Sequence, residues 1–136
     1  ELSLKLELEP SLDIVAFIAL SGYVKGTVAL SFPQNTALEL VSKIYEDKFH
    51  TIDSVVVDAL GEFANIVAAG AQNHLSQNLE QRIDLGVPTV VRGSCFNINY
   101  PSQATWIEIP FISDLGGFII RVTIKRGDGI QLFRQV

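Results

Sequence analysis

Two carboxylates and a carboxamide recur at helical spacing in the segment DALGEFANIVAAG, residues 58–70. Three residues separate Asp58 from Glu62, and two separate Glu62 from Asn65. Such spacings return to one stripe of an α-helix, here within about 60°. A carboxylate accepts hydrogen bonds or pairs with a cation, whereas a neutral carboxamide both donates and accepts. The stripe could therefore hold and orient polar groups of something that docks closely on that side of the helix.

The plain alternative is a solvated face, which every amphipathic surface helix has. Asn65 fits this alternative less well, because Asn is a mediocre helix former away from the helix ends. The flanking residues are also unusually small, namely Gly61, Ala64, Ala68, Ala69 and Gly70. We interpret these small flanks as leaving the polar side chains accessible to a partner.

The helix that carries the stripe is predicted to begin near Thr51 as N-cap, with Asp53 in its first turn, and to run to about Leu79. Ala69 continues the stripe, and Gln72 lies beside it. A helical projection puts the opposite, apolar face at Ile52, Val55, Ala59, Phe63, Ile66 and Gly70.

The elements around this helix are mainly strands. Residues 2–8 alternate leucine with polar residues, which predicts a strand with one solvated face, and LDIVAFIALSGYVKGTVALSF predicts a hairpin of two largely buried strands. A first helix is expected from Thr36, where Thr36 and Glu39 would form a capping box. PTVVRG, TWIEIPFI and FIIRVTIKR predict further strands, and GDG a turn. This order predicts a single α+β domain over residues 1–136, with a mainly antiparallel sheet of about five or six strands covered by long helices.

Composition limits the classes of partner. The net charge of −5 argues against nucleic acid or an anionic membrane, because both favour a basic surface. The longest uninterrupted apolar run, near residues 14–20, is far shorter than the roughly 18 to 20 residues that span a bilayer. The single cysteine, Cys95, suits a reducing compartment, so we expect a cytoplasmic protein. The chain contains no Met, so we also expect residues upstream of residue 1.

Other candidate sites are weak. His50 and His74 have no companions at metal-ligand spacing, so no metal site is predicted. Cys95 is interpreted as a passive small side chain. Glycine-rich pieces such as SDLGG lack the patterns of phosphate-binding loops, so no bound cofactor is expected.

The stripe extends to a longer signature, because 22 residues separate Asn65 from Pro88. The spacing D-x3-E-x2-N-x22-P resembles the motif of the CheC/CheX/FliY phosphatases of bacterial chemotaxis. SGYVKGTVALSFP is similar to the Gly-x-x-x-Gly hairpin of that family, and GVPTVVRG to its strand after the helix. One copy of the motif is present, as in the CheX-like branch. Members of that branch usually begin with a helix, whereas this chain begins with ELSLKLELEP.

The resemblance implies a function and a site. The substrate would be the phosphoaspartate of a CheY-like response-regulator receiver domain, which itself supplies Mg²⁺ and a lysine. Asn65 would orient the attacking water, and Glu62 would pair with the receiver lysine. Asp58 would serve positioning or structure, and Ala69 and Gln72 beside the stripe would serve positioning or partner binding. Pro88 would shape the chain after the helix.

Two further expectations follow. The resemblance implies a homodimer, and the alternating strand at residues 2–8 could pair with its copy across a twofold axis. A function of another class also stays open, because a non-catalytic CheC-like adaptor could keep the fold and bind a receiver, a motor or a signalling protein.

Overall fold

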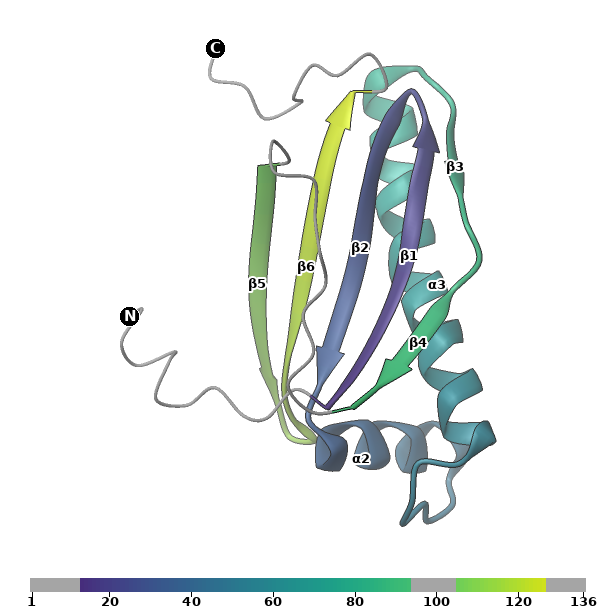
Figure 1. Ribbon diagram of the computed structural model, residues 1–136, viewed down its shortest axis with the longest axis vertical. Coiled ribbons are helices and arrows are strands. Elements are labelled where there is room, and N and C mark those ends of the chain that lie inside the picture. Colours follow the sequence, from purple (N-terminus) through teal and green to yellow (C-terminus); the bar gives the residue numbers. More distant parts are fainter. Residues whose placement is uncertain (1–12, 94–104, 127–136) are drawn as a thin grey trace, which may run out of the picture.

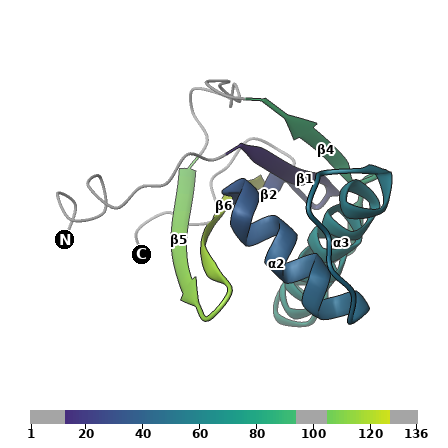
Figure 2. The ribbon, with the colours of Figure 1, turned by 90° about the horizontal axis from the view of Figure 1, so that it is seen from below.

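The computed structural model describes residues 13–93 and 105–126. Among these residues, a six-stranded antiparallel sheet forms one layer, and two helices pack on one of its faces (Figures 1 and 2). The predicted α+β class and the mainly antiparallel sheet are confirmed. The elements are β1 (Ile14–Gly22), β2 (Val24–Phe32), α2 (Gln34–Tyr45), α3 (Ser54–Leu79), β3 (Ile83–Leu85), β4 (Thr89–Arg92), β5 (Thr105–Ser113) and β6 (Gly116–Arg126).

The β1–β2 hairpin forms the centre of the sheet. The strand order is β3-β1-β2-β6-β5, and β4 pairs with the other half of β1. The register runs from Ile14 opposite Phe32 to Leu20 opposite Gly26. The hairpin predicted from residues 12–32 is therefore confirmed, and the chain returns to its edge through β3 and β4 after α3.

Steric constraints explain why both positions 22 and 26 of the Gly-x-x-x-Gly segment are glycine. Gly22 ends β1 at a φ of 97°, a left-handed conformation that favours glycine. Gly26 faces β6, where an added Cβ would overlap the carbonyl oxygen of Thr123 and lie 2.8 Å from its carbon. The hairpin can therefore approach β6 only because residue 26 has no side chain.

The core lies between the sheet and the helices. Every second residue of the central strands points toward the helices and is buried, among them Ile18, Val28 and Leu30. Figure 1 shows α3 running along the sheet. Its Ala64 and Ala68 are fully buried there, so these small residues allow the helix to approach the strands closely. Their packing role replaces our interpretation of them as small flanks that expose the polar stripe.

The start of α2 differs from the prediction. The helix begins at Gln34 with Pro33 as N-cap, and no side chain caps it. The predicted capping box of Thr36 and Glu39 is therefore wrong. Thr36 is buried instead, and its side chain packs so close to Gly116 in the β5–β6 turn that an added Cβ there would overlap it.

The start of α3 also differs from the prediction. Its N-cap is Asp53, whose carboxylate accepts a hydrogen bond from the Val56 N–H at 3.0 Å, so the prediction of Thr51 is wrong. The carboxylate satisfies a free amide of the first turn and also lies favourably at the positive end of the helix dipole.

The predicted apolar face of α3 is correct only in part. Ala59 is buried and Phe63 is half-buried, but Val55 and Ile66 are 42% and 60% exposed. The buried side of the helix is instead centred on Val56, Leu60, Ala64 and Ala68. The predicted apolar face is thus rotated about the helix axis away from the side that is buried. Apolar residues lie around most of this helix, so their positions alone do not define which side faces the sheet.

By length and composition alone, α3 is apolar enough to cross a membrane between Ser54 and Asn78, with a mean hydropathy of 1.4. Asp58, Glu62 and Asn65 interrupt this segment, so it contains no long uninterrupted apolar run. The core helix of a globular domain can have the same length and composition, and 33% of an 18-residue stretch within this segment is buried inside the protein. Several expectations, namely the strand at residues 2–8, Cys95 and the GDG turn, lie outside the described residues.

Candidate functional site

The polar stripe lies on the side of α3 that faces away from the sheet. Asp58 and Glu62 are exposed, and Asn65 is half-buried. Leu60 and Ala64, on the opposite side of the same turns, are fully buried. The packed side fixes the helix, so the stripe is presented on a rigid support.

The three polar side chains of the stripe have no polar partner among the described residues. Within residues 13–93 and 105–126, Asp58, Glu62 and Asn65 make no side-chain hydrogen bond or ion pair. By contrast, other polar side chains nearby have partners, such as Asp53 at the helix start. The carboxylate of Glu62 and the carboxamide of Asn65 are thus available to an external partner.

Two residues predicted beside the stripe lie differently. Ala69 is half-buried. The side-chain amide of Gln72 donates a hydrogen bond to the carbonyl oxygen of Ile83, which ties α3 to β3. A helical projection uses only the residues of the helix, so it could not predict that β3 lies next to Gln72. This bond gives Gln72 a place in the fold, whether or not it also meets a partner.

Pro88 contacts the helix that carries the stripe. An added Cβ at Gly61 would lie 3.6 Å from the Pro88 Cβ and 3.7 Å from a methyl carbon of Val90. Pro88 therefore packs against α3 one turn before Asn65. Proline has a fixed φ, and the role of Pro88 in shaping the chain that leads into β4 stays a prediction.

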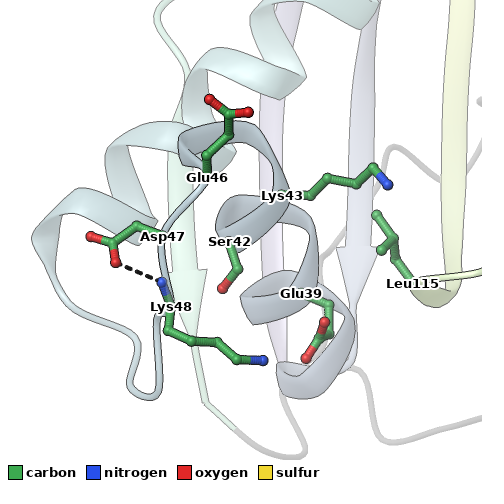
Figure 3. Close-up of a pocket in the computed structure, with 7 residues that line it drawn as sticks. All are labelled: Glu39, Ser42, Lys43, Glu46, Asp47, Lys48 and Leu115. Carbon is green, nitrogen blue, oxygen red and sulfur yellow. Dashed lines mark hydrogen bonds between the residues drawn. The ribbon is translucent and has the colours of Figure 1, made fainter.

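Two hollows of the surface lie away from the stripe. The larger of the two, of about 560 Å³, lies at the end of α2 and is lined by both acidic and basic side chains (Figure 3). It is lined by Glu39, Ser42, Lys43, Glu46, Asp47, Lys48 and Leu115. Another hollow, of about 330 Å³, lies over the β1–β2 hairpin between Lys25 and Lys125. Neither of these two hollows is lined by a residue of the stripe.

The chemistry available on this face is that of positioning. A carboxylate can pair with a cation, and a neutral amide can hold a water molecule without repelling an anion. Among the described residues, no group of three or more His, Cys, Asp or Glu side chains is arranged to hold a metal ion. The exposed carboxylates and the carboxamide of this face can bind and orient polar groups.

The motif residues lie inside a match to a known family. The family described as chemotaxis phosphatase CheX matches residues 14–112, most of the chain. The chain belongs to this family. The matched range includes Asp58, Glu62, Asn65 and Pro88, so the resemblance inferred from their spacing is confirmed at the level of the family.

Individual relatives agree with this assignment. The CheY-P phosphatase CheX of Thermotoga maritima is 27% identical over 116 residues, 85% of this chain and 74% of the relative. A CheC-like superfamily protein from Shewanella sp. PV-4 has a TM-score of 0.76 at 31% identity, over 84% of this chain and 74% of that one. A CheX from Borrelia burgdorferi, solved in complex with CheY, BeF3 and Mg²⁺, shares the fold with a TM-score of 0.75 at 21% identity, over 82% and 75%.

Proposed function

We propose that this CheX family member hydrolyses the phosphoaspartate of a CheY-like receiver domain in the cytoplasm. The observation that carries the proposal is the exposed face of α3, where Glu62 and Asn65 stand one turn apart with no partner among the described residues. Family membership supports the phosphatase activity, and the name of the Thermotoga maritima relative supports CheY-P as the class of substrate.

Asn65 would act on the attacking water. Phosphoryl transfer depends mainly on in-line positioning of the nucleophile and on neutralising charge at the phosphoryl oxygens. The amide of Asn65 would hold the water through its donor and acceptor atoms, and its neutrality avoids repulsion with the phosphoryl dianion. The water oxygen would bond to phosphorus as the bond to the aspartate oxygen breaks, which releases inorganic phosphate and restores the carboxylate.

Glu62 would fix the register of docking. The receiver supplies Mg²⁺ and a lysine at its phosphorylation site, and both neutralise charge there. The exposed carboxylate of Glu62, one helical turn from Asn65, would pair with that lysine. Asp58, one turn further toward the helix start, would then serve positioning at the edge of the contact.

A panel of phosphorylated receivers tests the proposal against the adaptor alternative. Dephosphorylation would be followed by phosphate release with and without the protein, and binding by the change in receiver fluorescence. Acceleration for at least one receiver that binds supports the phosphatase. Binding without acceleration across the panel would leave only the adaptor.

The homodimer stays a prediction, since the strand at residues 2–8 lies outside the described residues. Light scattering on the purified protein checks it. A mass near twice the 14.9 kDa of this chain supports the dimer, and a monomeric mass contradicts it.

A further inference from the structure

The outer side of α3 is more apolar than its contact with the sheet requires. Of an apolar stretch of 18 residues within Ser54–Asn78, 33% is buried inside the protein. Two large apolar side chains remain uncovered on this helix, with Ile66 60% exposed and Val55 42% exposed.

These two side chains flank the proposed docking residue. Val55, Glu62 and Ile66 follow one another at spacings of seven and four, which place them on one line of the helix. Glu62 lies between Asn65 and Ile66 around the helix, about 60° from the first and about 40° from the second. A partner that pairs with Glu62 while it reaches Asn65 therefore comes close to Ile66 as well.

The fold gains little from isoleucine at position 66. The side chain is mostly in water, so it adds little to the core, and a β-branched residue is a poorer helix former than Ala at an exposed site. Isolated exposed apolar residues are ordinary on protein surfaces. Ile66, however, lies within one helical turn of Glu62 and Asn65, and a second large apolar residue of the same helix, Val55, is also exposed.

We propose that Ile66 is an apolar anchor that becomes buried against the receiver beside its phosphoaspartate pocket, with Val55 as a smaller contact further along the same line. This inference rests on the proposed function and deepens it. Interfaces commonly combine a desolvated apolar anchor with polar groups that set the register. The anchor supplies affinity equally before and during the reaction, so it changes KM and leaves the chemical step alone.

The test compares two isoleucines. Ile66→Ala removes the anchor, and Ile44→Ala is the matched control, because Ile44 is 54% exposed on a different helix, α2. The dissociation constant would be measured by titration with a receiver loaded with beryllium fluoride, and kcat and KM by phosphate release. Thermal unfolding would verify that both variants fold like the wild type.

If Ile66 is an anchor, Ile66→Ala should have a tenfold larger dissociation constant, a loss of about 1.4 kcal/mol of binding free energy. KM should rise by a similar factor while kcat stays within about twofold, and Ile44→Ala should match the wild type. If Asn65→Ala abolishes the activity but Ile66→Ala binds the receiver as tightly as the wild type, the proposed function stands and the role of Ile66 as an anchor is overturned. Equal weakening by Ile44→Ala would overturn it too. A wild type that binds none of the receivers would overturn the anchor and the proposed function together.

Discussion

The same substitution at two glycines is expected to shift stability in opposite directions. Gly26 lies in β2 against β6, and Gly70 lies on the exposed side of α3. A Cβ at residue 26 would overlap the Thr123 carbonyl oxygen, 2.8 Å from its carbon and 3.0 Å from the Ile124 Cα. A Cβ at residue 70 would meet nothing within 4 Å.

The magnitudes follow from these surroundings. At Gly26 the atoms in the way are backbone and cannot rotate aside, so β2 and β6 must separate. Overpacking typically costs about 1 to 3 kcal/mol, and each buried backbone group that loses its partner costs about 1 to 3 kcal/mol more. Gly26→Ala should therefore lower the free energy of unfolding by about 2 to 6 kcal/mol. Gly70→Ala should raise it by about 0.5 to 1 kcal/mol, since Ala is the better helix former.

Urea unfolding followed by circular dichroism measures both changes in one series. For a domain of this size, each kcal/mol also corresponds to roughly 3 °C in Tm. The reasoning would be refuted by a Gly26→Ala protein within about 1 kcal/mol of the wild type, since its backbone clash could then not be real. A destabilised Gly70→Ala protein would show that the helix has a neighbour at that position.

Two further substitutions separate structural from functional roles on α3. Gln72→Leu removes the donor to the Ile83 carbonyl and should lower the free energy of unfolding, measured in urea, by about 1 to 2 kcal/mol. The control Asn73→Ala, at an exposed neighbouring residue, should change it by less than about 0.5 kcal/mol. Equal stability of the two variants would contradict a stabilising role of the hydrogen bond. Glu62→Gln should raise KM for the phosphorylated receiver about tenfold and weaken the dependence of KM on salt. The carboxylate is exposed in the free protein and would pair with the receiver lysine only on docking. An unchanged KM with the same salt dependence would show that this ion pair does not form.

The strands and the stripe could be predicted because their signals are local. Alternating or continuous apolar runs bounded by Gly and Pro defined the β1–β2 hairpin and the later strands. The spacing of Asp58, Glu62 and Asn65 placed them on one side of a helix, whatever that helix packs against. Asp58 and Glu62 are indeed exposed, and Asn65 is half-buried.

The helix starts were harder, because several residues near each start could cap it. Thr51 and Asp53 are both suitable caps, and the carboxylate that reaches the Val56 amide decides between them. The Thr36–Glu39 pattern also matched a capping box, but Thr36 is needed under the β5–β6 turn. Such competition depends on contacts far along the chain.

The apolar anchor could not be predicted for a related reason. The segment of α3 contains apolar residues around most of its circumference, so a projection alone does not define which arc meets the sheet. Only the packed structure places Leu60 inside and leaves Ile66 mostly in solvent. The hydrogen bond of Gln72 likewise depends on β3, which follows α3 in the chain.

The amide of Asn65 is the centre of the account, and its removal is the most direct test. Single-turnover phosphate release from a phosphorylated receiver would be measured for the wild type, Asn65→Ala and the control Asn73→Ala, with receiver binding measured for each. The account predicts that Asn65→Ala still binds the receiver but releases phosphate about 100-fold more slowly, the loss expected when a nucleophile is no longer positioned. Asn73→Ala should match the wild type. An Asn65→Ala protein that binds the receiver and releases phosphate as fast as the wild type would contradict the central claim.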